Sequence, residues 1–246
     1  MRIALLLLAL LPAPAMAAEL YGEGRLVSDH RFRGLSRSNA EPAVQASLDL
    51  EAGDVRAGVF ASSLSGAGRP PGAGAELTLS AGYTRPLGLG SLDLGLTLYN
   101  FPGADHAASV IEAQAALSRT IGPLHLTAGA AWAPSQAGLA LRSGAHASSL
   151  YGWGSARLDV PGTPMSLSAR LGHTRGALIG GRALAGTARA WDWKLGMDYA
   201  AGPFTIGAAL AGTDLGQARA QALGLNVPGG RNLAGTGLVL SIAAGF

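Results

Sequence analysis

A repeated alternation of apolar and polar side chains is the feature that most constrains the fold of this chain. Between Ser91 and Leu98 a leucine stands at every second position, with Ser, Asp, Gly and Thr between them. Successive side chains of a β-strand point to opposite faces, so this period predicts a strand with one apolar face. The same period recurs at residues 44–50, 165–172 and 191–199. A half-buried sheet of a soluble sandwich has this period too, so alternation alone does not identify the fold.

The lengths of the connections separate the two possibilities. Short connections such as Ile121–Gly122 alternate along the chain with long ones such as Leu64–Gly74. Short turns on one side and long loops on the other, with an even number of strands, are typical of an outer-membrane barrel. We therefore predict an all-β fold, a transmembrane antiparallel up-and-down β-barrel of about 12 strands, with 10 to 14 possible. The predicted strands are residues 19–30, 41–50, 54–63, 75–85, 90–101, 109–120, 123–133, 148–160, 164–174, 188–200, 203–213 and 235–246.

The composition favours an apolar surface that helices do not cover. Hydrophobic residues make up 48% of the chain and charged residues 13%, whereas the usual charged share is about 25%. The 37 glycines and 13 prolines disfavour long helices. The chain has no cysteine, which excludes disulfides, thiolate metal sites and cysteine nucleophiles. The formal charge of +3 involves no basic run, so nucleic-acid binding is not predicted.

The two ends of the chain have the features of an exported barrel. Arg2 precedes an uncharged run, Ile3–Leu11, and a small-x-small cleavage signal follows at Ala15–Ala17. We predict a signal peptide over residues 1–17 and a single barrel domain over residues 18–246, located in the bacterial outer membrane. At the other end the alternating stretch Leu238–Phe246 finishes in an aromatic residue. It resembles the terminal strand of outer-membrane barrels, which pairs with the first strand.

One segment carries a family resemblance. Residues Leu26–Ser36 read Leu-Val-Ser-Asp-His-Arg-Phe-Arg-Gly-Leu-Ser. They resemble the start of the TorF-type porins, a proteobacterial outer-membrane family of unproven function, whose members carry a V-S-D-Y-R-F-R-G-I-S run followed by a polar pair and a Pro-containing strand. Here that continuation is Glu41–Gln45, and His30 departs from the usual Tyr. The resemblance implies an outer-membrane barrel of porin type and no particular substrate. Weaker likeness lies at Glu76–Tyr83, Tyr99–Ala104, Trp191–Gly196 and Phe246.

If the leucine rows face lipid, the opposite faces line the interior, since a charge facing lipid near the midplane costs several kcal/mol. The predicted pore-lining residues are Glu23, Arg25, Asp29, Gln45, Asp49, Arg56, Glu76, Asp93, Glu112, Gln114, Arg157, Asp159, Arg170, Asp192, Lys194 and Asp198. About eight strands are filled by side chains, and 16–18 leave a channel. A twelve-stranded barrel is therefore compatible with a narrow aqueous path or with a lumen closed by its own ion pairs.

Arg31 and Arg33 are candidates for the rim or a constriction, because guanidinium groups at the outer end of the first strand suit an anionic solute. The alternative is structural. In that case Asp29 pairs with an arginine, Phe32 packs at the rim, and Gly34 supplies a turn with positive φ.

Aromatic residues near the predicted strand ends suit interfacial anchors. These residues are Trp132, Trp153, Trp191, Trp193, Tyr151 and Tyr199. Tyr151 and Trp153 share the polar face of their strand, so a stacking surface for a sugar or nucleobase is an alternative for this pair. The long Gly- and Ala-rich loop from Asp214 to Ala234 is the predicted plug of the lumen, on length alone.

The function predicted from the sequence is that of an outer-membrane porin that passes small hydrophilic solutes through a narrow lumen of mixed charge. Its predicted partners are outer-membrane lipid and a small polar solute, with no metal and no cofactor. A closed structural barrel with ligand- or partner-binding outer loops is the first alternative. An outer-membrane hydrolase is the second, although no G-x-S-x-G motif or clustered histidines are present. A secreted sandwich is the third. The sequence specifies neither the solute nor the oligomeric state.

Overall fold

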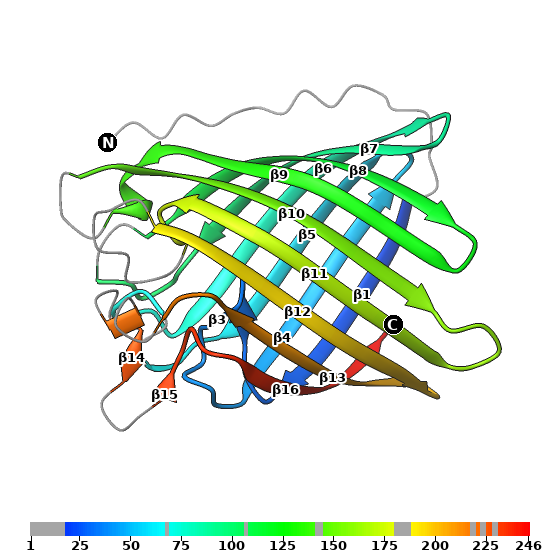
Figure 1. Ribbon diagram of the computed structural model, residues 1–246. Helices are drawn as coiled ribbons and strands as arrows, with labels where there is room; N and C mark the ends of the chain where they lie inside the picture. Colours follow the sequence, from blue (N-terminus) through cyan, green and yellow to red (C-terminus); the bar gives the residue numbers. More distant parts are fainter. Residues whose placement is uncertain are drawn as a thin grey trace.

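The computed structural model describes residues 18–66, 69–105, 108–140, 145–179, 188–216, 220–221, 225–227 and 231–246. These residues form a closed antiparallel barrel of twelve strands (Figure 1), which confirms the predicted fold class. The barrel strands are β1 (Ala18–Val27), β4 (Ala43–Ala52), β5 (Val55–Ser63), β6 (Ala75–Leu87), β7 (Gly90–Asn100), β8 (Val110–Ile121), β9 (Leu124–Gln136), β10 (Ala147–Asp159), β11 (Met165–Gly176), β12 (Ala188–Ala201), β13 (Phe204–Thr213) and β16 (Gly237–Gly245). The predicted signal peptide lies outside the described residues.

The barrel closes where its first and last strands meet. Leu26 of β1 lies opposite Ile242 of β16 in the antiparallel register. Beyond β16, the backbone N–H and C=O of Phe246 exchange two hydrogen bonds of 2.9 Å with those of Gly22. A Cβ atom at Gly22 would overlap the Phe246 ring, so the terminal aromatic lies directly over this glycine of the first strand. Closure removes the unpaired strand edges that a bilayer does not tolerate.

The outer surface of the barrel is apolar. Leu96 of β7 is 58% exposed, Leu195 of β12 is 56% exposed and Leu240 of β16 is 53% exposed. Such rows would be unusual on a monomer in water, but they match the apolar band of a transmembrane barrel. A soluble sandwich would instead bury these leucines between two sheets, and the closed topology excludes that alternative.

Exposed aromatic residues lie toward both ends of this outer surface. Trp132 and Trp191 are near the end that carries the long loops, whereas Tyr83, Tyr199 and Phe204 are near the end with the short turns. This distribution is that of interfacial anchors. Tyr151 and Trp153 are different, because both side chains point into the barrel.

The strand boundaries agree with the prediction to within three residues. The first strand has one of the two largest differences. It was predicted to reach His30, but β1 ends at Val27. The reason lies in Asp29, whose Oδ1 accepts hydrogen bonds from the hydroxyls of Ser36 (2.5 Å) and Ser38 (3.2 Å). These bonds fold the chain back on itself immediately after the strand. Asp29 therefore belongs to the first loop and not to the barrel wall.

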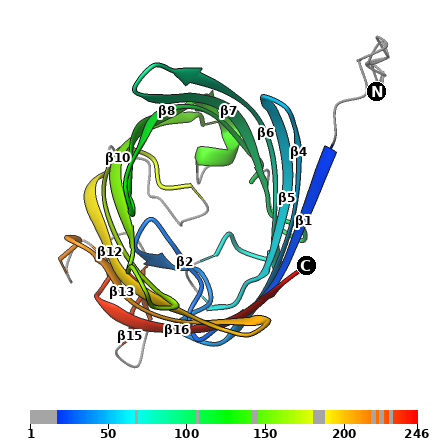
Figure 2. The ribbon, with the colours of Figure 1, turned by 90° about the vertical axis from the view of Figure 1, so that its right-hand side faces the viewer.

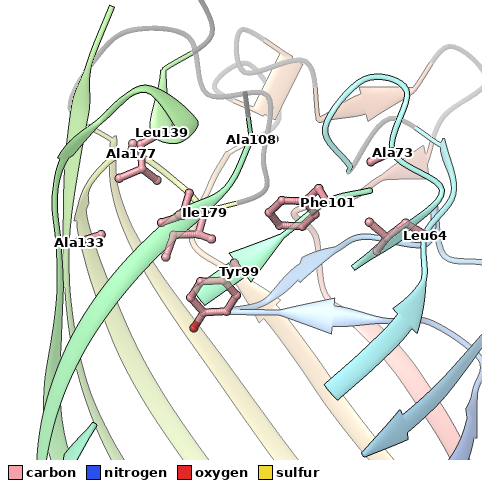
Figure 3. Packing of buried hydrophobic residues seen from close by; sticks show 10 residues of the cluster. Leu64, Ala73, Tyr99, Phe101, Ala108, Ala133, Leu139, Ala177 and Ile179 are labelled. Carbon is pink, nitrogen blue, oxygen red and sulfur yellow. The ribbon is translucent and has the colours of Figure 1, made fainter. Parts of the chain in front are cut away.

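Inside the long-loop end, buried apolar residues form a group that we call the mouth cluster (Figure 3). It receives residues from the loops after β5, β7, β9 and β11, and Phe32 packs against it. Its members are Leu64, Ala73, Tyr99, Phe101, Ala108, Val110, Ala133, Leu139, Ala177 and Ile179. The 3-10 helix η2 (Ala137–Leu139) supplies one of them. The mouth cluster gives the long loops a fixed packing surface.

Candidate functional site

The segment between β1 and β4 folds into the barrel and not over it. Strands β2 (Arg31–Phe32) and β3 (Leu35–Ser36) pair as a hairpin, and Figure 2, a view into the barrel, shows β2 within the ring of strands. The two residues between them, Arg33 and Gly34, both have positive φ, at 48° and 77°. This is the backbone of a two-residue hairpin turn. We call the inward-folded segment, residues 28–40, the strap.

Gly34 is required by space as well as by its backbone conformation. A Cβ atom there would overlap the carbonyl oxygen of Gly212 in β13. The hairpin tip therefore lies directly against the barrel wall. Arg33 beside it holds a left-handed conformation that costs a non-glycine residue about 1–2 kcal/mol. Its side-chain contacts must offset that cost.

Arg31 ties the strap to one side of the barrel. Its Nε donates to Asp29 Oδ2 at 2.6 Å. Its Nη1 donates to the carbonyl oxygens of Gly34 (3.1 Å), Ala211 (3.0 Å) and Gly235 (2.6 Å). The last two acceptors belong to β13 and to the loop before β16. With its charge paired and its donors engaged, Arg31 acts here as a structural anchor.

Arg33 ties the strap to the opposite side. Its Nη2 donates to both carboxylate oxygens of Glu112 in β8, at 2.7 and 2.8 Å. Its guanidinium carbon lies 3.9 Å from the ring centroid of Tyr151 in β10. The side chains of Arg33 and Glu112 are 9% and 2% exposed. The Nη1 of Arg33 is buried and has no hydrogen-bond partner among the described residues.

A third attachment involves Arg37, which the sequence analysis did not single out. Arg37 is 1% exposed. It forms an ion pair with Glu76 of β6, and its Nη2 donates to the carbonyl oxygen of Ile179 at 2.7 Å. Glu76 also lies 3.1 Å from His30 Nε2, and Gln45 donates to His30 Nδ1 at 2.8 Å. The strap is therefore held by three of its own arginines, which bind three different parts of the wall.

A cavity of about 670 Å³ lies beside the strap inside the barrel. It is lined by strap residues, including Arg31 and Arg33, and by the inward faces of the surrounding strands. The predicted pore-lining residues that line it are Arg25, Asp29, Gln45, Glu112, Gln114, Arg157, Arg170, Asp192, Lys194 and Asp198. Tyr151 and Trp153 also line it, which keeps the stacking alternative for this pair open.

The other predicted pore-lining residues lie outside the boundary of this cavity: Glu23, Asp49, Arg56, Glu76, Asp93 and Asp159. Arg56 Nη1 lies 3.4 Å from Asp93 Oδ1, and the Arg56 side chain passes over Gly82 of the strand between them. Asp159 pairs with Arg157 at 3.0 Å and with His125 at 3.2 Å. The Arg56–Asp93 and His125–Asp159 pairs each join two strands, and they lie on the inner face toward the short-turn end.

The loop from Asp214 to Ala234 is the predicted plug, and its described residues pack outside the cavity lining. Among the described residues of Asp214–Ala234, none lines the cavity. Leu215, Ala220, Leu225 and Leu233 pack with Leu35 and Leu178 in a second buried cluster. This loop includes β14 (Asn226–Val227) and β15 (Arg231–Asn232), while residues 217–219, 222–224 and 228–230 lie outside the described chain. Among the described residues, the strap is the segment that enters the lumen, and its arginines pair with carboxylates on the wall.

The described residues contain no group of three or more His, Cys, Asp or Glu side chains placed to hold a metal ion. None of the helices within the described ranges has the length and apolar character needed to cross a bilayer.

Comparisons with known proteins agree with the fold. A family model described as "Bacterial protein of unknown function (Gcw_chp)" matches residues 13–246. The solved KdgM porin has 7% identity and a TM-score of 0.56, over 92% of this chain and 99% of the porin. A protein solved in work on in-meso crystallization of membrane proteins has 13% identity and a TM-score of 0.51, over 92% and 83% of the two chains. At these identities the likeness shows the fold alone.

A third solved structure, the COG4313 outer membrane channel from Pseudomonas putida F1, has 15% identity and a TM-score of 0.48, over 95% of this chain and 96% of that one. No curated protein matches the chain.

Proposed function

The chain belongs to the Gcw_chp family of bacterial proteins of unknown function, and we propose that it is an outer-membrane porin that passes small hydrophilic solutes. The observation that carries the proposal is the pairing of an apolar outer surface with a polar cavity of about 670 Å³ inside a closed barrel. A barrel that served only as an anchor would not need polar side chains around an internal space. The resemblance of Leu26–Ser36 to the TorF-type porins supports the same function.

The lumen would select solutes by width and charge. The strap narrows the long-loop end, and the inner wall beside it carries both cations and carboxylates. In channels, such rings of side chains and the pore width together decide which solutes enter. The proposed location is the bacterial outer membrane, reached with the predicted signal peptide, and the proposed partners are lipid and a small polar solute.

Single-channel recording in planar bilayers tests the proposal. The folded, purified barrel is expected to give discrete current steps in KCl. The control is a sample from the same preparation that has been heat-unfolded before addition, which should give none. A folded barrel that inserts but never conducts would overturn the porin proposal.

The second candidate is a closed structural barrel, and the strap favours it. Three buried arginine attachments hold the strap inside the lumen. If the strap closes the passage, a folded barrel inserts without current steps, and a variant with a loosened strap conducts. A hydrolase remains an alternative only if lipid ester turnover is measured and is lost on one Ser→Ala change.

A further inference from the structure

Two cations face each other on the cavity wall, and neither forms an ion pair with a described residue. Arg170 of β11 and Lys194 of β12 are direct partners in the antiparallel register. Side chains at such positions have Cβ atoms about 4.5–5.5 Å apart, and like charges there destabilise a sheet. Both residues line the cavity. The pairing of these two cations therefore does not stabilise the sheet itself.

Neither cation forms an ion pair with a described residue, although the charge of Arg170 interacts with Asp192 and that of Lys194 with Asp198. Arg170 makes one polar contact, from Nε to Tyr151 Oη at 3.4 Å. Lys194 has no hydrogen bond or ion pair to any described residue. Asp192 Oδ1 accepts from Tyr151 Oη at 3.1 Å, and Asp192 Oδ2 has no hydrogen-bond partner among the described residues. Asp198 lies 4.0 Å from Arg157 Nη1.

The residues that line the cavity include more cations than carboxylates. Six of its lining residues are Arg or Lys, and four are Asp or Glu. Two of the four carboxylates, Asp29 and Glu112, are already bound to the strap arginines. Arg33 adds a buried Nη1 without a partner among the described residues. Arg25 and Arg157 pair with Glu23 and Asp159, which lie outside the cavity lining. The lining cations without an ion pair to a described residue are therefore Arg170 and Lys194.

A flat apolar surface stands beside these cations. Tyr151 and Trp153 are stacked, with ring centroids 5.6 Å apart and planes 16° from parallel. Arg33 packs over Tyr151, and the Arg170 guanidinium carbon lies 5.1 Å from the centroid of Trp153. Tyr151 is 1% exposed, whereas Trp153 is half-buried and borders the cavity. Trp153 is thus the accessible end of the stack.

We propose that the cavity binds and selects small organic carboxylates that carry a flat apolar face. Lys194 and Arg170 hold the carboxylate, and Trp153 stacks on the flat face. The bound anion relieves the repulsion between the two cations, because charge-assisted hydrogen bonds to a carboxylate are the strongest that these side chains form. The volume of about 670 Å³ is within the range of small-molecule sites. Selection of solutes rests on the porin proposed above, whereas binding does not.

Reversal potentials measure the selectivity. In a KCl gradient the channel is expected to pass chloride more readily than potassium. Lys194→Gln and Arg170→Gln should each lower the permeability ratio, and the double variant should bring it to one or below. The matched control is Arg119→Gln, because Arg119 lies between the exposed Leu117 and Ile121 on the same outer face of β8. Arg119→Gln should leave the ratio unchanged. A cation-selective wild type, or equal effects of all three changes, would overturn the proposal.

Benzoate is the probe for binding, measured by isothermal titration of the detergent-folded barrel. Lys194→Gln should weaken benzoate about tenfold, the usual effect of losing one charged hydrogen bond. Trp153→Leu should weaken benzoate and leave acetate unchanged. Resistance to SDS at room temperature confirms that each variant is folded.

The two proposals can fail separately. Benzoate binding without any channel current would defeat the porin and keep the carboxylate site. Current steps without benzoate binding by the wild type would keep the porin and defeat the site. Equal benzoate affinity in the wild type and Lys194→Gln would also defeat the site.

Discussion

Two groups of cations inside the barrel are built differently. The strap arginines Arg31, Arg33 and Arg37 are each paired with a carboxylate, and the side chains of these pairs are at most 9% exposed. The wall cations Arg170 and Lys194 have no such partner among the described residues. Charges that are buried together must be matched, since an unmatched one is costly. The strap group therefore maintains the shape of the lumen, and the wall group is free to meet a solute.

Removing the carboxylate from the most buried pair should have the largest effect. In Glu76→Gln, Arg37 stays buried without a charged partner, and His30 loses the carboxylate it contacts. Removing one partner of a buried pair typically costs about 3–5 kcal/mol. Urea unfolding of the detergent-folded barrel measures the loss, and bilayer recordings should show larger or noisier current. A loss below about 1 kcal/mol would mean that the strap pairs are no different from surface pairs.

A change at the hairpin tip should have an intermediate effect. In Gly34→Ala, the new Cβ overlaps the Gly212 carbonyl and the backbone keeps a φ of 77°. We expect a loss of about 1–3 kcal/mol from strain at this position. The matched control is Gly88→Ala in the turn between β6 and β7, where a Cβ meets no atom within 4 Å. The same urea unfolding should show little change for the control. Equal stability of the two variants would contradict the docked position of the hairpin.

The smallest effect is expected from an ion pair near the short-turn end. Arg56 and Asp93 are 3.4 Å apart, with side chains 43% and 16% exposed. Asp93→Asn should cost about 0.2–1 kcal/mol, and salt should reduce the difference further. Unfolding at low and high KCl measures both. A loss as large as that of Glu76→Gln would remove the distinction between buried and solvated pairs.

The sequence predicted the barrel well because strand alternation and connection length are local signals. Twelve strands, the closing role of Leu238–Phe246 and the inward face of residues such as Lys194 all follow from counting positions along one strand. The inner pairs do not. Arg37 and Glu76 are 39 residues apart, and Arg33 and Glu112 are 79 apart. Nothing local links them.

The plug prediction also rested on a local signal. Length favoured the loop from Asp214 to Ala234, but the strap enters the lumen because its arginines reach carboxylates on β6 and β8. The strap agrees with the structural alternative for the segment Leu26–Ser36 at three residues. Asp29 pairs with Arg31, Phe32 packs on the mouth cluster, and Gly34 makes the turn. The pairing of Arg33 with Glu112 could be recognised only in the folded structure.

Cysteine accessibility at two adjacent residues tests most directly which side chains face the lumen and which face lipid. The chain has no cysteine of its own, so a single introduced cysteine can be followed. Lys194 lines the cavity, and Leu195, the next residue of β12, is exposed on the apolar outer surface. In lipid vesicles, Lys194→Cys should react with a charged, membrane-impermeant thiol reagent, and faster with an anionic reagent than with a cationic one. Leu195→Cys should not react. Reaction at Leu195→Cys with none at Lys194→Cys would contradict the account.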